Sequence, residues 1–156
     1  MNRRLVHTLV PCWTFALLCA SAVPGFAQSQ YGDWPHRGTL ALLTTPQGAN
    51  LPASAQEDGV PVLVRLNGET FDFSQSNADG SDIRFSAEGQ PLAYQIETWN
   101  SKQSEACIWV RIPVMRGNAR QELTLHWGKT DAASESNGKA VFNESNGYAV
   151  AMHLGD

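Results

Sequence analysis

The chain has 156 residues, of which 42% are hydrophobic and 17% are charged, a composition that suits a globular protein with an apolar core. Eleven lysines and arginines face 15 aspartates and glutamates, so the net charge is −4. This acidic balance argues against nucleic acid or an anionic membrane surface as a partner, because both attract basic proteins.

The N-terminus carries the pattern of a secretory signal peptide. Arg3 and Arg4 precede an apolar stretch over residues 5–22, and residues 21–27 (SAVPGFA) end with small residues at the first and third positions before a cut. A positive region, an apolar region and a small-residue cleavage site together mark an export signal. We therefore predict a signal peptide over residues 1–27 and a periplasmic, cell-surface or extracellular location. An uncleaved anchor is disfavoured because it needs about 20 clean apolar residues.

Removal of the signal peptide would change the charge and the cysteine content. Residues 28–156 hold 9 basic and 15 acidic residues, which gives a net charge of −6. Cys12 and Cys19 leave with the signal, so Cys107 has no partner for an internal disulfide. Lipidation of Cys19 is disfavoured because Leu18 stands where a small residue is needed. No second apolar run is long enough to cross a bilayer, and we expect no membrane span in the mature chain.

Short apolar segments separated by turn residues follow a lead-in over residues 28–36. This spacing predicts an all-β fold, an antiparallel β-sandwich of jelly-roll-like form, in one module over residues 37–147. No stretch shows a sustained helical stripe. The expected strands cover residues 37–44, 60–66, 82–85, 92–99, 106–112, 122–127 and 148–154.

Alternation of apolar and polar residues supports these strands. In residues 60–66 the three valines and Leu66 occupy alternate positions, and Arg65 points the other way. Residues 106–112 and 122–127 repeat the pattern. A period of two is typical of half-buried antiparallel strands. Pro61 indicates the start or the edge of a sheet, because proline has no N–H for the ladder.

Residues 77–82 (NADGSD) are the best candidate for a metal site, with oxygen-bearing side chains at alternate positions around a glycine. A calcium loop of this type needs a bidentate glutamate near its twelfth position, which is Glu88. The strand-like residues 83–85 argue against such a loop, and Asp-Gly favours a hairpin turn. His126 and Cys107 lie on strands without other ligands or a base nearby, so we predict no metal and no cofactor.

Catalytic motifs are missing from the sequence. It holds no Gly-x-Ser-x-Gly elbow and no phosphate-binding glycine loop. Glu97 and Glu105 could form a glycosidase pair, but 15 acidic residues make such pairs easy to find by chance. We therefore predict a protein that is not an enzyme, with a glycoside hydrolase as the less favoured alternative.

Aromatic and basic residues on the strands are the candidate ligand-binding residues. Trp99 and Trp109 are offset from the aliphatic faces of their strands, which makes them the candidates for an exposed pair that stacks on sugar rings. Arg65 and Arg111 would donate to hydroxyls or carboxylates. The interpretation we prefer is that these rings fill the core or cover a neighbouring domain, because large aromatics carry much of the buried area of a protein.

Six short segments occur in order along the chain: 61–66 (PVLVRL), 71–73 (FDF), 79–85 (DGSDIRF), 91–97 (PLAYQIE), 108–113 (IWVRIP) and 126–128 (HWG). Taken together, they resemble the bacterial domain of unknown function 2341 family over residues 38–145. The resemblance implies an exported β-sandwich, often placed before a concanavalin A-like lectin/glucanase domain or in the periplasmic part of a proton-channel protein. It implies no catalytic residues.

These features together predict a noncatalytic, exported, carbohydrate-associated or cell-surface module. A polysaccharide or glycan and a downstream lectin-like domain are the expected partners. The alternative is a periplasmic interaction or spacer domain of a membrane transport complex. Residues 148–156 resemble the first strand of a following lectin-like domain, so they either begin such a domain or form a C-terminal strand of this module.

Overall fold

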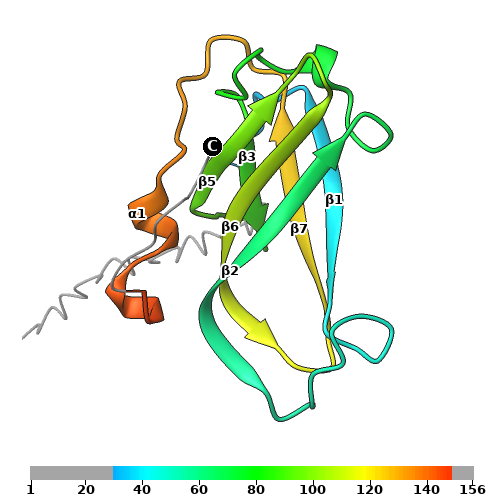
Figure 1. The fold of residues 1–156 in the computed structure, drawn as a ribbon, viewed down its shortest axis with the longest axis vertical. Coiled ribbons are helices and arrows are strands. Elements are labelled where there is room, and N and C mark those ends of the chain that lie inside the picture. The colour runs from blue at the N-terminus through cyan, green and yellow to red at the C-terminus, as the bar shows by residue number, and fades with distance from the viewer. Residues whose placement is uncertain (1–29, 149–156) are drawn as a thin grey trace, which may run out of the picture.

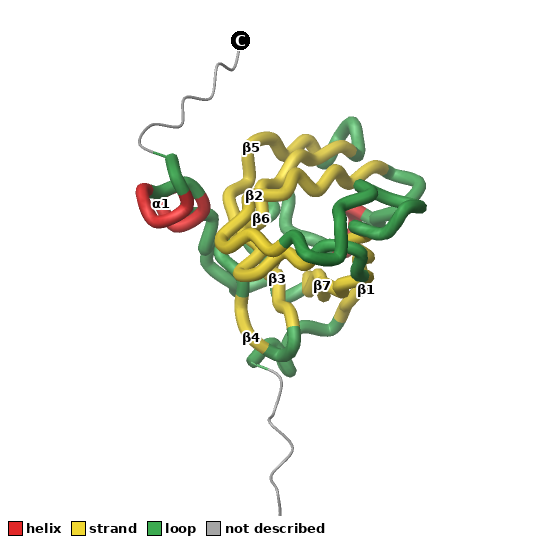
Figure 2. Tube along the Cα trace, turned by 90° about the horizontal axis from the view of Figure 1, so that it is seen from below, coloured by secondary structure: helices red, strands yellow, loops and turns green. Residues whose placement is uncertain are grey.

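The computed structural model describes residues 30–148. Within this range seven strands form two sheets that pack face to face, with little helix (Figures 1 and 2). The predicted all-β sandwich is confirmed. The strands are β1 (His36–Leu43), β2 (Gln56–Asn67), β3 (Arg84–Ala87), β4 (Gln90–Pro91), β5 (Tyr94–Asn100), β6 (Glu105–Arg116) and β7 (Arg120–Trp127), and the helical turns are η1 (Phe73–Gln75), α1 (Gly138–Val141) and η2 (Glu144–Asn146).

Every strand pairs with antiparallel neighbours. One sheet has the order β1-β7-β3-β4 and the other the order β2-β6-β5. A jelly roll has eight strands in two Greek keys. The domain resembles a jelly roll in its two packed sheets but has seven strands over residues 30–148. The chain crosses between the sheets after β1, β2, β4 and β6.

Six expected strands correspond to β1, β2, β3, β5, β6 and β7. The strands β2 and β6 are longer than expected, with 12 residues each, and β4 was not expected. Residues 77–82 form a hydrogen-bonded turn as expected, but no strand precedes them, so the turn is not a hairpin. Residues 149–154 of the last expected strand lie outside the described residues.

The hydrophobic core fills the space between the two sheets. Alternate residues of β6 contribute to it: Ile108, Val110 and Ile112 are at most 2% exposed. From the other sheet, Phe85 and Leu125 meet them with exposures of 0% and 2%. Burial of these side chains is the main force that holds the sheets together. The period-two patterns are therefore confirmed as inward and outward faces.

Both edges of the β2-β6-β5 sheet are protected from further pairing. Pro61 lies in the edge strand β2, where its missing N–H costs no ladder bond, as expected from the sequence. At β5, the Ile96 N–H donates to Ser136 Oγ (2.8 Å), and the Asn137 N–H donates to the Tyr94 carbonyl (2.8 Å). Capped edges of this kind limit aggregation through sheet extension.

The expected lead-in is part of the folded domain. Tyr31 is 6% exposed, and its ring lies 5.0 Å from that of His126. Trp34 donates from Nε1 to the Asp82 carbonyl at 2.7 Å, and its ring stacks under the Arg84 guanidinium at 5.3 Å. Residues 30–35, the N-terminal segment, thus cover the outer face of the β1-β7-β3-β4 sheet. Across residues 30–148 no helix is long and apolar enough to cross a membrane.

Candidate functional site

Three of the four candidate ligand residues lie on the outer face of the β2-β6-β5 sheet. Arg65 on β2 is exposed and sits opposite Cys107 on β6. Trp109 and Arg111 follow on the same face of β6, because they alternate with the buried residues of that strand. The fourth residue, Trp99, does not join them.

Trp99 points into the core, so the candidate exposed pair is wrong. A β-bulge between Ile96 and Thr98 inserts one extra residue, Glu97, into β5. Before the bulge, Gln95 pairs with Trp109. After the bulge, Trp99 pairs with Ala106, and both side chains lie on the inner face of the sheet. One inserted residue reverses the faces that a strand presents.

Trp99 packs with aromatic residues at one end of the sandwich. Its ring lies 5.9 Å from Phe71 and 5.1 Å from Phe73. Gly80 approaches so closely that a Cβ atom there would stand 2.7 Å from the indole, and its φ of +70° also favours glycine. The interpretation preferred from the sequence, that the large rings fill the core, therefore describes Trp99.

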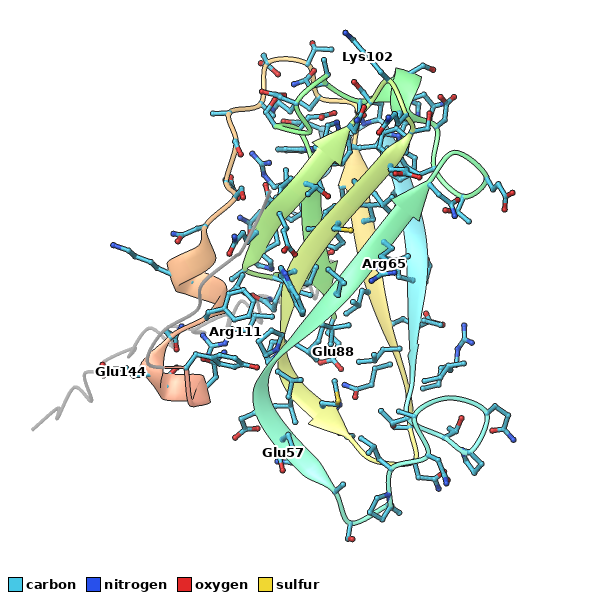
Figure 3. All side chains as sticks on the ribbon, in the orientation of Figure 1. Glu57, Arg65, Glu88, Lys102, Arg111 and Glu144 are labelled. Atoms are coloured by element: carbon cyan, nitrogen blue, oxygen red, sulfur yellow. The ribbon has the colours of Figure 1, made fainter. Side chains whose placement is uncertain are left out.

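The chain itself partly covers Trp109 and Arg111. We call residues 134–148 the C-terminal strap, which includes α1 and η2 and runs beside β5 and β6 (Figure 1). The ring of Phe142 meets Trp109 edge-on at 5.5 Å, and Arg111 donates to Ser145 Oγ at 3.0 Å. Figure 3 shows Arg111 beside the turn that carries Glu144. Trp109 also donates from Nε1 to Glu97 at 2.5 Å.

These contacts leave no open aromatic platform on the described residues. Tyr148, at the end of the strap, is the one large hydrophobic side chain there that is exposed, at 40%. It stacks edge-on against Phe142 at 5.3 Å. A sugar-binding platform of the expected kind would require the strap to move away from Trp109.

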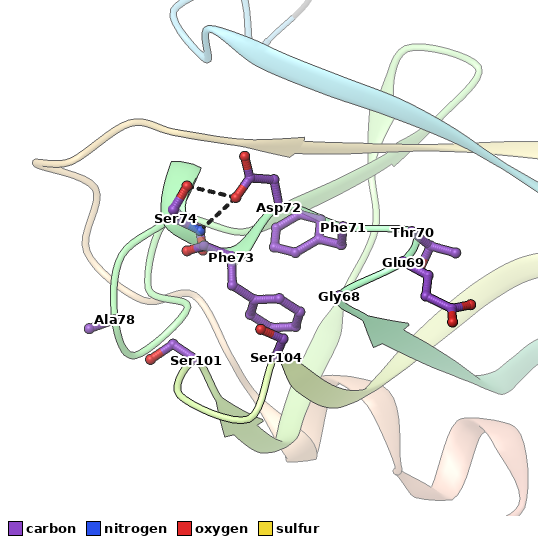
Figure 4. A pocket seen from close by; sticks show the side chains of 11 residues that line it. Gly68, Glu69, Thr70, Phe71, Asp72, Phe73, Ser74, Ala78, Ser101 and Ser104 are labelled. Atoms are coloured by element: carbon purple, nitrogen blue, oxygen red, sulfur yellow. Dashed lines mark hydrogen bonds between the residues drawn. The ribbon is translucent and has the colours of Figure 1, made fainter.

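A hollow of about 690 Å³ opens at the end of the sandwich where the 67–78 loop meets the 101–104 turn (Figure 4). We call it the apical hollow. Its volume lies within the roughly 300–1,000 Å³ of ligand pockets, although it is open and mostly polar. The lining residues are Gly68, Glu69, Thr70, Phe71, Asp72, Phe73, Ser74, Ser76, Ala78, Ser101 and Ser104.

Local hydrogen bonds shape the loop that lines this hollow. Asn67 accepts on Oδ1 from the Glu69 and Thr70 N–H groups, each at 3.1 Å. Asp72 caps η1 by accepting on Oδ1 from the N–H (3.0 Å) and hydroxyl (2.6 Å) of Ser74. Side chains of this kind at turns and helix starts are typical of Asx turns and N-caps. The loop is therefore held in a fixed shape.

The bonds from Ser74 also set the charge of the hollow. They lower the pKa of the Asp72 carboxyl, because a hydrogen bond to the carboxylate favours the ionised form. Among the described residues the hydrogen bonds to the Asp72 side chain come from Ser74 and use Oδ1, which leaves Oδ2 for a ligand. The sequence pattern includes Phe71 and Phe73 but does not single out the polar residues around them, because single Ser, Thr and Glu residues in a loop carry no pattern.

A polar cluster that the sequence did not reveal lies under the N-terminal segment. His126 Nε2 stands 2.9 Å from Ser86 Oγ, the contact seen in activated serines. Both residues are nearly buried, with exposures of 5% and 7%, and Tyr31 packs against the His126 ring. Burial and the charge of Arg37 lower the His126 pKa. The pair is closed to a substrate, and we assign it a structural role.

The turn at residues 77–82 uses its oxygens within the protein. The buried Asp82 carboxylate accepts from the N–H groups of Asn77 (2.9 Å) and Gly128 (2.6 Å). Asp79 Oδ1 accepts from the Ser81 N–H at 3.0 Å. Within residues 30–148 no group of three or more His, Cys, Asp or Glu residues is placed to hold a metal ion.

Two further hollows lie elsewhere on the sandwich. One of about 470 Å³ includes Arg111 and Gly59, and one of about 750 Å³ opens between the sheets near Arg116 and Arg120. Neither Glu97 nor Glu105, the carboxylates considered for glycoside hydrolysis, lines any of the three hollows described here.

The fold and these surfaces define an antiparallel β-sandwich domain. Residues 79–149 match the model of the family described as "Domain of unknown function (DUF2341)", the family that the segments in the sequence resemble. The match begins at the turn before β3, so it leaves β1, β2 and the loop with Glu69 and Asp72 outside, whereas the resemblance in the sequence began at residue 38. The chain has no significant match among curated proteins or solved structures.

Proposed function

We propose that this protein is an exported, noncatalytic accessory module that binds carbohydrate through the apical hollow. The main support for this proposal is the hollow of about 690 Å³, which is lined by hydroxyls and by two carboxylates on a loop of fixed shape. Carbohydrate recognition depends on many hydrogen bonds to hydroxyl groups, and this surface supplies partners for them. Export is supported by the signal-peptide pattern of residues 1–27.

Affinity electrophoresis of the processed protein through gels that contain polysaccharides tests this proposal. We expect retardation in at least one gel, and we expect Ser101→Tyr, which fills the hollow, to remove it. Ser54→Tyr, the same substitution in the exposed turn before β2 and outside the hollow, is the matched control and should migrate like the wild type. Free migration of the wild-type protein in every gel would refute carbohydrate binding.

The outer face of the β2-β6-β5 sheet stays a second candidate for the same ligand. Trp109, Arg111 and Arg65 lie on that face, with the strap over the first two. Phe142→Ala would loosen the strap, and stronger retardation of that variant would favour this face over the hollow. Trp99 has no part in this binding mode, because it faces the core.

A spacer or interaction domain of a membrane transport complex is the second function that an observation favours. The internal position of Trp99 and the strap over Trp109 are typical of a rigid module without an exposed stacking surface. In that case the Ser101→Tyr variant would assemble with its native partners as the wild type does in a co-purification from the native host. A loss of assembly in that variant would contradict the spacer role.

A further inference from the structure

We infer that the apical hollow selects an uncharged, hydroxyl-rich saccharide and rejects acidic polysaccharides. This inference rests on the proposed function, since it names the class of carbohydrate that the hollow would bind. It follows from the balance of hydrogen-bond donors, acceptors and charges around the hollow.

Acceptor atoms dominate the lining. Glu69 and Asp72 each present carboxylate oxygen, and an ionised carboxylate only accepts hydrogen bonds. The Ser74 hydroxyl donates to Asp72 and the Thr70 hydroxyl donates within its own turn, so these two oxygens have only lone pairs left to offer. A ligand must therefore bring donors. Sugar hydroxyls donate to such acceptors and still accept from other groups.

Two hydroxyls complement this surface from the opposite side. Ser101 and Ser104, on the turn between β5 and β6, face the Asp72 loop across the hollow (Figure 4). A hydroxyl can rotate to donate or to accept. The pair can therefore serve either end of a sugar hydroxyl network, which fits a ligand whose groups act as both donors and acceptors.

Positive charge is missing from the lining. None of the eleven lining residues is Lys, Arg or His, and Lys102, which shares the turn with Ser101, does not line the hollow. The lowered pKa of Asp72 keeps its carboxylate charged at neutral and mildly acidic pH. The net charge of −6 expected for the processed chain adds a repulsive field. Uronate or sulfate groups would thus meet two carboxylates in a lining that holds no basic residue.

Ring stacking contributes little to this site. Phe71 and Phe73 lie in the wall, but their exposures are 5% and 6%, so most of their surface faces Trp99 and the core. Hydrogen bonds to the carboxylates must therefore carry the selectivity. For that reason the loss of one negative charge should weaken binding while the fold stays intact.

The test uses the full processed protein and three classes of probe measured by isothermal titration: a neutral hexaose (cellohexaose, N-acetylchitohexaose or mannohexaose), oligogalacturonate and chitosan oligomers. We expect binding of a neutral hexaose, at least tenfold weaker binding by Glu69→Gln and by Asp72→Asn, and no binding of oligogalacturonate. Asparagine keeps the Oδ1 that caps η1, and unchanged circular dichroism will confirm the fold. Glu105→Gln, next to Ser104 but outside the lining, is the matched control.

The possible outcomes distinguish a failure of this inference from a failure of the proposed function. Binding of oligogalacturonate that Ser101→Tyr abolishes would overturn the neutral-sugar inference and leave carbohydrate binding in the hollow intact. Binding of chitosan alone would overturn it too, because attraction of amines rather than hydroxyl recognition would explain the result. Binding of a neutral sugar that both carboxylate variants leave unchanged would place the site elsewhere. Absence of all binding would refute the inference together with the proposed function.

Discussion

Replacement of Arg84 by methionine should remove a large part of the stability of the fold. Arg84 is 2% exposed although its guanidinium carries a full charge. It donates to four acceptors at distances between 2.6 and 3.1 Å: the carbonyl oxygens of Ser81, Ile83 and Ala133 and the hydroxyl of Tyr94. These bonds join β3 to the chain that leads into the strap and to the first residue of β5.

The expected loss follows from these contacts. Four hydrogen bonds at about 1 kcal/mol each amount to about 4 kcal/mol. The Nε atom lies 3.2 Å from a carboxylate oxygen of Glu135 without the alignment of a hydrogen bond. The Glu135 side chain is 60% exposed, so this ion pair adds at most about 1 kcal/mol. A domain of this size has a total stability of about 6–18 kcal/mol. Arg84→Met should therefore lower the free energy of unfolding by about 4 kcal/mol.

Urea unfolding, followed by tryptophan fluorescence and far-ultraviolet circular dichroism, measures this loss. Arg65→Met is the control, because Arg65 is exposed and should change stability by less than about 0.5 kcal/mol. Arg84→Lys keeps the charge without the planar fork and should fall between the two. A free energy of unfolding for Arg84→Met within about 1 kcal/mol of the wild type, at an unchanged urea dependence, would show that water replaces the guanidinium at its acceptors.

Three further predictions concern other parts of the sandwich. Trp99→Ala should lower the free energy of unfolding in urea by about 3–5 kcal/mol, because the ring packs against the core. Trp109→Ala should lower it clearly less, and equal losses for the two variants would contradict the bulge. Gly80→Val should lower the melting temperature by more than about 5 °C, because a β-branched residue would have to adopt the left-handed backbone conformation and would clash with the Trp99 indole. An unchanged melting temperature would contradict the close approach of Gly80 to Trp99. The pKa of His126 is lower in the folded state than in the unfolded chain. Its contribution to stability is therefore complete above a pH of about 6.5 and declines as the pH falls below that value. The free energy of unfolding should accordingly decrease between pH 7 and 5, and His126→Gln should make this decrease smaller.

Sequence patterns predicted the strands well because burial leaves a period-two signature. The inward residues of β6 are invariably apolar from Ile108 to Ile112, and this regularity located the strand and its faces. The same reasoning placed Pro61 either among the first residues of a strand or at a sheet edge, and it lies in the edge strand β2. Strand order and the covering of the sheet faces left no comparable signature, since they depend on contacts between residues 40 to 90 positions apart.

The candidate site was predicted less well, for two physical reasons. A single bulge at Glu97 reversed the orientation of Trp99, and the sequence of β5 contains no glycine that would mark such an insertion. The strap crosses Trp109 and Arg111 through contacts from Phe142 and Ser145, which lie in a segment of mixed composition. The apical hollow arises from two loops that meet only in the fold, so its residues could not be grouped beforehand.

The N-terminal segment and the C-terminal strap adhere to opposite broad faces of the sandwich, one over Arg84 and His126 and the other over Trp109 and Gly59. A pulling force on the two ends of the described residues would therefore act first on these two attachments and only afterwards on the two packed sheets. Each attachment has few bonds and would peel away in sequence. A stretching experiment on single molecules should show two small yielding steps ahead of the main rupture.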